Sequence, residues 1–233
     1  MVLDAATGTG NFANRIGKAV ESADRIIGID ISLSLLNRAR AFRNEQIETG
    51  SSSNCRYHFL AAAVELLPFA GETFDVVTIR NSLHHLGDPD RALCEMVRVV
   101  KPGGILFIME MHRDHLDLSQ LSHVKLHHWG ARIDEIEGKI HRRTFTRAKI
   151  RELVESSTAV VVSVAEYKPP ADPEYDLPGL IRHVKERISK NLGRIRDHEQ
   201  VDRLQRESES IIEHIQEHGY NGVTETVIVA KRR

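Results

Sequence analysis

The chain has 233 residues, 41% hydrophobic and 28% charged, which predicts one globular domain, or one domain with an added element. Its 32 basic and 33 acidic residues nearly cancel and only 5% of residues are aromatic, so no nucleic acid partner is expected. Two cysteines cannot form a disulfide framework, the longest apolar runs are too short to cross a bilayer and no signal peptide is apparent, so we expect a cytoplasmic protein without a membrane partner.

Short β-branched runs alternate with helical stretches over the first 110 residues, the pattern of a parallel sheet covered by helices on both faces. Gly, Pro, Asp or Asn bounds each run, and the apolar continuity of the runs suits strands buried on two sides. Two further strands follow later in the chain. The predicted strands are residues 1–5, 25–30, 56–61, 74–80, 104–111, 158–167 and 224–230.

Apolar residues that recur every three or four positions predict helices between these strands. Asp88 and Pro89 suit the N-cap and first position of one helix, and Asp197 can cap the last. The predicted helices are residues 11–20, 33–48, 89–100, a long region from 112 to about 155 broken near Gly138, 180–195 and 197–218.

The last two helices predict a hairpin inserted between the final two strands, after an irregular connection that contains Pro169, Pro170, Pro173 and Pro178. The sequence therefore predicts an α/β fold with a core at 1–168, the hairpin at 169–221 and the last core strand at 222–233. The apolar stripes of the hairpin could be buried against each other or the core. They could also form a lid over a site or pair two subunits as a homodimer.

A glycine-rich turn at Gly8 and Gly10 joins the first strand to the first helix, at the sheet edge where open α/β proteins bind ligands. The glycines let a ligand approach the backbone, and the helix N-terminus offers N–H donors. Asp30 ends the second strand, where its carboxylate can accept from both ribose hydroxyls, and Ile31 could cover one face of an adenine. These residues predict an adenosine-containing ligand. The turn fits the loose G-x-G-x-x-A form of dinucleotide proteins, and it also fits S-adenosylmethionine.

Further blocks distinguish the two ligands. They are Leu-Leu-Pro-Phe at 66–69, Thr-Phe-Asp-Val-Val at 73–77, Asn-Ser-Leu-His-His-Leu at 81–86, Asp-Pro at 88–89 and Arg-Val-Val-Lys-Pro-Gly-Gly at 98–104. Together with Asp4 before the glycines, they resemble class I S-adenosylmethionine-dependent methyltransferases of the small-molecule type, in order and in separation. The resemblance covers about a hundred residues. It implies a Rossmann-like, mostly parallel seven-stranded sheet, S-adenosylmethionine as cofactor and a small-molecule acceptor methylated by in-line displacement.

The resemblance also implies which residues contact the cofactor. It assigns Asp4, Gly8 and Gly10 to the methionine end, Asp30 to the ribose, Ile31 and Val64 to the two faces of the adenine, and Asn81 to the methionine moiety or the acceptor. Ala6 stands where the family commonly has its first glycine. Ala63 stands where many relatives have an acid that accepts from the adenine amino group, so one contact worth about 1 kcal/mol is missing. The sequence begins on the first strand, without the helix that usually precedes it in the family. Either this start is too late, or the hairpin, a partner subunit or both cover that side.

Two histidines after the fourth strand, His84 and His85, stand where a general base would act on a hydroxyl or a protonated amine acceptor. The same pair could instead serve packing and turn formation. A thiol or neutral amine acceptor needs no base. Glu110 and His112, at the end of the fifth strand, are expected to be pocket residues.

His123 and His127 lie one helical turn apart, a spacing that could ligate a metal. The chain has no H-E-x-x-H motif and no carboxylate at a metal position of the family, so no metal is expected. Two other functions stay open. Ala63 and the missing leading helix would suit a non-catalytic S-adenosylmethionine-binding protein, and the glycine turn alone would suit an NAD-dependent dehydrogenase.

Overall fold

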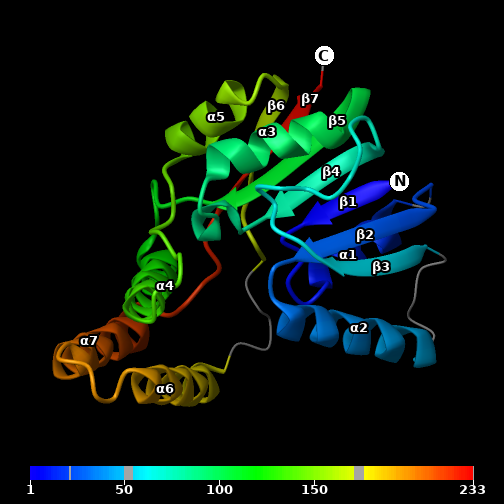
Figure 1. The fold of residues 1–233 in the computed structure, drawn as a ribbon. Helices are drawn as coiled ribbons and strands as arrows, with labels where there is room; N and C mark the ends of the chain where they lie inside the picture. Colours follow the sequence, from blue (N-terminus) through cyan, green and yellow to red (C-terminus); the bar gives the residue numbers. More distant parts are fainter. Residues whose placement is uncertain (21, 50–54, 171–175, 233) are drawn as a thin grey trace. The chain divides into compact units, whose positions relative to one another are not determined.

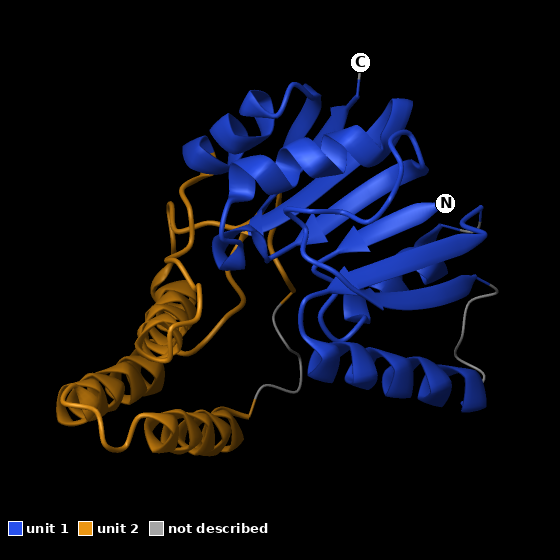
Figure 2. Ribbon diagram, viewed as in Figure 1, with its two compact units in different colours: residues 1–110, 148–165, 226–233 blue, residues 111–147, 166–225 orange. Residues whose placement is uncertain are grey.

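The computed structural model describes residues 1–20, 22–49, 55–170 and 176–232. The chain forms two compact units (Figure 2). The first contains residues 1–110, 148–165 and 226–233, and the second contains residues 111–147 and 166–225. Within the described part of the chain, no helix has the length and apolar character needed to cross a membrane.

A seven-stranded sheet in the order β3-β2-β1-β4-β5-β7-β6 forms the centre of the first unit (Figure 1). Its strands are β1 Val2–Ala5, β2 Arg25–Asp30, β3 Arg56–Ala61, β4 Phe74–Arg80, β5 Val100–Met111, β6 Val160–Tyr167 and β7 Glu225–Lys231. The pairs among β1 to β5 are parallel. The N–H of Arg232, just past β7, donates to Gly104 near the start of β5, so β7 runs antiparallel to β5. The predicted fold class is confirmed.

The strand order reverses between β1 and β4. From β1 the chain builds outward to β2 and β3, then returns to place β4 on the other side of β1. Such a switch point leaves a crevice beyond the carboxyl ends of the two strands, where α/β proteins bind ligands. The turns after β1 and β4 therefore lie where a ligand site is expected.

Helices cover both faces of this sheet; Figure 1 shows α3 in front of it and α1 behind it. The helices of the first unit are α1 Asn11–Ala19, α2 Leu33–Glu48, α3 Pro89–Val99 and α5 Arg147–Ser156. Asp88 caps α3 by accepting the N–H of Arg91 at 3.0 Å, and Pro89 is its first residue, as predicted. Leu3, Ile29, Ile79 and other side chains of the central strands are fully buried.

Three helices, α4 Leu118–Ile136, α6 Leu177–Arg194 and α7 Val201–His218, form the second unit. Their shared core consists of Leu126, Trp129, Ile133, Val184, Ile188, Ile195, Leu204, Ile211 and Ile215. The indole N–H of Trp129 donates to the carbonyl of Leu204 at 2.8 Å. The sequence predicts α4 as part of the core domain, whereas the buried side chains of α4 pack with those of α6 and α7. An amphipathic pattern predicts that a helix buries one face but does not say against which neighbour.

Several predicted boundaries differ from those observed. The helix α3 ends at Val99, and β5 begins directly at Val100 instead of residue 104. The long helical region contains only α4 and α5, and residues 112–117 and 137–146 lie outside helices. Gln200 is the N-cap of α7, not Asp197, because the chain first forms a turn in which Val201 N–H donates to His198. Of the predicted proline-rich connection, residues 171–175 lie outside the described residues.

Candidate functional site

The turn between β1 and α1 has a positive φ at every second residue: Ala6 at 53°, Gly8 at 55° and Gly10 at 77°. Glycine adopts this conformation without strain, whereas an alanine pays for its Cβ. Ala6 therefore keeps the backbone shape that the sequence pattern expects of a glycine. A Cβ on Gly8 would have no atom within 4 Å, whereas one on Gly10 would lie 3.1 Å from Ala39 and 3.2 Å from Phe59. Gly8 thus faces open space, and Gly10 allows close packing behind the turn.

Asp30, at the end of β2, holds this turn in place. One carboxylate oxygen accepts the N–H of Gly8 at 2.9 Å, and the other accepts the N–H of Ser32 at 2.8 Å. A carboxylate oxygen has further lone pairs, so both atoms can still accept hydroxyl hydrogens. Asp30 consequently links the glycine turn to the segment that would face a ribose.

Asp4, the last but one residue of β1, is a buried carboxyl with 1% of its surface exposed. It accepts hydrogen bonds from the hydroxyls of Thr7 at 2.6 Å and Thr78 at 2.9 Å. Burial raises the pKa of the Asp4 carboxyl to about 6, because the hydroxyl bonds only partly offset the loss of water. A perturbed carboxyl at a switch point is a typical feature of a functional site.

A cavity of about 310 Å³ opens between the turns after β1 and β4. The residues that line it are Asp4, Ala6, Thr7, Gly8, Thr9, Asn11, Phe12, Arg80, Asn81 and Ser82. Four of these, Asp4, Ala6, Gly8 and Asn81, are among the predicted cofactor residues. Asn81 has a φ of 47°, a conformation that asparagine tolerates better than most residues.

The other predicted cofactor residues lie outside this cavity lining. Ile31 is 79% exposed, an unusual position for a large apolar side chain and one that an adenine ring could cover. Val64 is 3% exposed and Ala63 is half-buried, so the adenine sandwich with Val64 stays a prediction. Gly10 supports the turn from behind, and Asp30 acts through the N–H of Gly8.

Sequence reasoning missed six residues that line the cavity: Thr7, Thr9, Asn11, Phe12, Arg80 and Ser82. Most of them are direct neighbours of predicted residues in the same two turns, so the turns themselves were the available signal. Arg80 directly precedes Asn81 and so had this signal too, whereas the approach of its guanidinium to the ring of Phe12, at 5.5 Å, arises only after the chain folds.

The two predicted catalytic histidines have different surroundings. His84 is fully buried, and its Nδ1 lies 2.6 Å from Oε1 of Glu110, which is also fully buried. Oε2 of Glu110 accepts the N–H groups of Ser82 and Leu83, at 3.0 and 2.9 Å. Glu110 thus orders the loop after β4 and fixes the orientation of the His84 ring. His85 is exposed.

Neither histidine lines the 310 Å³ cavity. A role for His84 in ordering the loop therefore has the direct geometric support, while a role as general base stays a prediction. His112, predicted in the same pocket as Glu110, is buried, and its Nδ1 accepts the N–H of Asp114 at 3.2 Å. Burial lowers the pKa of its imidazole.

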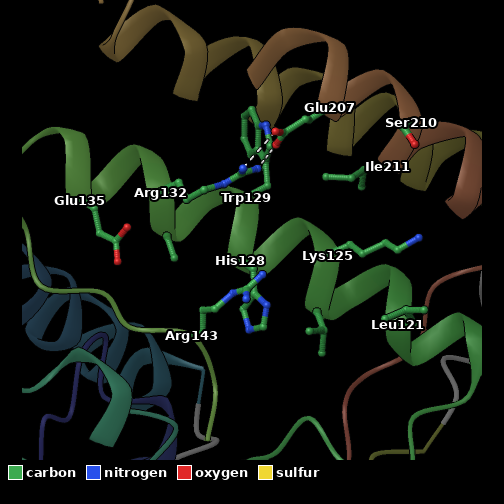
Figure 3. A pocket seen from close by; sticks show the side chains of 12 residues that line it. Leu121, Lys125, His128, Trp129, Arg132, Glu135, Arg143, Glu207, Ser210 and Ile211 are labelled. Atoms are coloured by element: carbon green, nitrogen blue, oxygen red, sulfur yellow. Dashed lines mark hydrogen bonds and ion pairs between the residues drawn. The ribbon is translucent and has the colours of Figure 1, made fainter. Parts of the chain in front are cut away.

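The second unit contains a larger cavity of about 590 Å³ between α4 and α7 (Figure 3). Apolar side chains such as Leu121 and Ile211 line it together with Lys125 and Arg143, and Arg132 forms an ion pair with Glu207 across it. The cavity volume is in the range of small-molecule sites. Trp129 also lines the cavity and belongs to the helical core, with 1% of its surface exposed.

Comparisons with known proteins agree with the geometry of the first unit. The family model described as "Methyltransferase domain" matches residues 3–108. The ubiquinone/menaquinone biosynthesis C-methyltransferase UbiE of Cellvibrio japonicus is 37% identical over 117 residues, which are 50% of this chain and 45% of that protein. The UbiE protein of Haemophilus ducreyi is 39% identical over 122 residues, which are 52% of this chain and 45% of that protein. The chain spans about half the length of these curated relatives.

Solved structures resemble the whole chain in fold. A SAM-dependent methyltransferase from Methanosarcina mazei has a TM-score of 0.62 at 16% identity, covering 99% of this chain and 91% of that one. The [4+2]-cyclase SpnF also has a TM-score of 0.62, at 19% identity, covering 99% of this chain and 73% of that one. At such identities the likeness shows a shared fold, which by itself does not decide between activities.

Proposed function

We propose that this chain, which belongs to the class I S-adenosylmethionine-dependent methyltransferases, transfers the methyl group of S-adenosylmethionine to a small-molecule acceptor. The family assignment rests on the matched residues 3–108 and on the fold. What we propose, beyond the family assignment, is that the whole chain catalyses methyl transfer.

The observation that carries the proposal is the buried carboxyl of Asp4 in the lining of the cavity. Burial raises its pKa, so a bound cation beside it would stabilise the ionised carboxylate. S-adenosylmethionine supplies positive charge on its sulfonium and its amino group. An NAD pyrophosphate would bring negative charge to the same turn, next to this carboxyl. The Asp4 site therefore favours S-adenosylmethionine over a dinucleotide.

Methyl transfer from a sulfonium is an in-line displacement at carbon. The protein has to hold the acceptor atom near 3 Å from the methyl group in a dry pocket, which contributes several kcal/mol to catalysis. We propose that Asp4, Gly8 and Asn81 position the methionine end and that Asp30 positions the ribose. An acceptor that must lose a proton would also need a base, the role proposed for His84 or His85.

The acceptor is proposed only as a small molecule. The UbiE relatives carry the name of C-methyltransferases in quinone biosynthesis, but the alignments cover about half of this chain. Free Cys55 and Cys94 support a reducing, cytoplasmic location. The lid or dimerisation roles expected for the hairpin stay predictions.

Binding of S-adenosylhomocysteine, measured by calorimetry, tests the proposal. The variants are Asp30→Asn and a control, Asp24→Asn, which removes the same charge at the exposed opposite end of β2, where Asp24 pairs with Arg56. We expect Asp24→Asn to bind like the wild type and Asp30→Asn to bind about tenfold more weakly, because a charge-assisted acceptor for the ribose is lost. Absence of binding by the wild type would refute the function, and equal binding by all three proteins would refute the site.

A turnover assay then separates an enzyme from a non-catalytic binding protein. The wild type is incubated with S-adenosylmethionine and a panel of amine, hydroxyl, thiol and quinone acceptors, and S-adenosylhomocysteine is quantified. Formation that depends on one acceptor supports the enzyme. Tight binding without turnover on any acceptor class supports the binding protein.

A further inference from the structure

A chain of polar side chains connects α4 to the segment that follows it, within the second unit. Nε2 of His127, on α4, lies 3.1 Å from Nε2 of His141. The two rings are 4.7 Å apart between centroids, at 72° to each other. On its other side, Nδ1 of His141 lies 2.7 Å from Oδ2 of Asp134. The remaining oxygen of Asp134, Oδ1, forms an ion pair with Arg194 of α6.

The proton positions follow from this arrangement. A carboxylate that is paired with a guanidinium accepts hydrogen bonds and does not donate them. The proton between Asp134 and His141 therefore belongs to Nδ1 of the imidazole. In the neutral ring, Nε2 of His141 then carries a lone pair that points toward Nε2 of His127.

Two imidazole nitrogens at this separation match the geometry of a metal site. With metal–nitrogen bonds of about 2.0–2.1 Å, nitrogens 3.1 Å apart subtend roughly 100° at a shared ion, between octahedral and tetrahedral angles. A carboxylate that accepts from the other ring nitrogen is the usual second partner of a metal-binding histidine. Asp134 holds that position at His141.

The neighbouring histidines are engaged differently. His123, the partner suggested by helical spacing, stacks on Tyr220 at 5.1 Å and 11°, and its ring centroid is 6.5 Å from that of His127. Nε2 of His128 accepts the N–H of Thr144 at 3.1 Å.

We propose that His127 and His141 bind a divalent late first-row transition metal ion, such as zinc, and that Asp134 positions His141. Imidazole ligands suit zinc, nickel, cobalt and copper. Water or further ligands complete the coordination of the ion. The proposal departs from the expectation that the chain binds no metal, and it does not depend on the proposed methyl transfer.

Metal titration of the full chain, purified without a histidine tag and treated with chelator, tests this site. Zinc binding is followed by calorimetry and cobalt binding by visible absorption. We expect one ion per chain. We expect His127→Ala and His141→Ala each to weaken zinc binding at least a hundredfold, because each variant leaves only one of the two histidine ligands. Asp134→Asn should weaken it by about 10- to 100-fold.

His123→Ala is the matched control, since it removes a histidine one turn away on the same helix. It should bind zinc within twofold of the wild type. Circular dichroism establishes that each variant is folded, and His127→Gln replaces His127→Ala if the alanine variant is not. The proposal is overturned if the wild type does not bind, if the His127 and His141 variants bind like the wild type, or if His123→Ala loses binding as they do. The short contact is then an ordinary hydrogen bond between two imidazoles.

Discussion

Gly8 and Gly138 have the same backbone handedness, with φ of 55° and 77°, and a Cβ on either would have no atom within 4 Å. They differ in surroundings, because Gly8 lines the 310 Å³ cavity and Gly138 lies just after α4. We expect Gly8→Ala and Gly138→Ala each to lower the free energy of unfolding by about 1 kcal/mol, the cost of a Cβ in this conformation. Only Gly8→Ala should also weaken S-adenosylhomocysteine binding, by tenfold or more. Urea denaturation and calorimetry measure the two effects, and equal binding by both variants would contradict the site.

Asp4 predicts a specific dependence of stability on pH. Its folded pKa of about 6 is above the ordinary value of 3.8, so the folded state holds this proton more tightly than the unfolded state. The stability that it contributes is therefore complete below pH 3.8 and is lost as pH rises through about 6. A shift of roughly two units corresponds to about 3 kcal/mol.

The comparison that isolates this effect is Asp4→Asn, which keeps the size of the side chain and removes the titration. Relative to Asp4→Asn, the wild type should lose about 2 kcal/mol of unfolding free energy between pH 4 and pH 7, because the rest of the effect lies below pH 4. Denaturant titrations at several pH values measure the difference. A difference that does not vary with pH would show that Asp4 does not titrate in this window.

For single residues, the sequence predicted where a residue lies better than it predicted its pKa or its hydrogen-bond partner. Asp4, Gly8 and Asn81, which line the cavity, could be picked out because each lies near the carboxyl end of a strand, and strand ends are local features. The raised pKa of Asp4 depends on burial in the folded chain, and the bond from the Thr78 hydroxyl that partly offsets it joins residues far apart in sequence. The pairing of His127 with His141 joins residues 14 positions apart through a loop, which has no periodic signature.

The N-caps of α6 and α7 show how far the start of a helix can be predicted from nearby residues. Asp176 caps α6 by accepting the N–H of Gly179 at 2.9 Å. Asp197, predicted to cap α7, instead lies in the turn before it with 91% of its side chain exposed. Replacing Asp176 with Ala should cost about 1 kcal/mol of unfolding free energy, and Asp197→Ala should cost almost nothing. Thermal and urea unfolding of the two variants would decide, and a larger loss for Asp197→Ala would contradict the observed start of α7.

Elements with clear boundaries were predicted to the residue. The strands Arg25–Asp30, Arg56–Ala61 and Phe74–Arg80 and the helix Leu33–Glu48 have the expected limits. The start of β5 was missed because Pro102, Gly103 and Gly104 usually interrupt structure, whereas here they lie within a strand. The register of β5 with β4 shifts there, between the pairs Phe74–Val100 and Val76–Ile105, and such a shift cannot be read from the local residues.

For the whole molecule, the sequence predicted the α/β class and the inserted hairpin but not the membership of α4 in the second unit. The unit to which a helix belongs depends on which other helix its apolar face packs against. Trp129 of α4 is buried with Leu204 and Ile211 of α7, far away in sequence. The residues that build the second unit come from two separate stretches, 111–147 and 166–225, and the first unit comes from three.

The place of β7 in the sheet has a consequence for synthesis of the chain. β7 lies between β5 and β6, yet it is made after both. While the ribosome is still translating the helices of the second unit, one side of β5 has no hydrogen-bonding neighbour in the sheet and β6 has nowhere to dock. Such an unprotected edge invites pairing with other nascent chains. Chaperone dependence during translation should therefore end only when residues 225–231 have emerged.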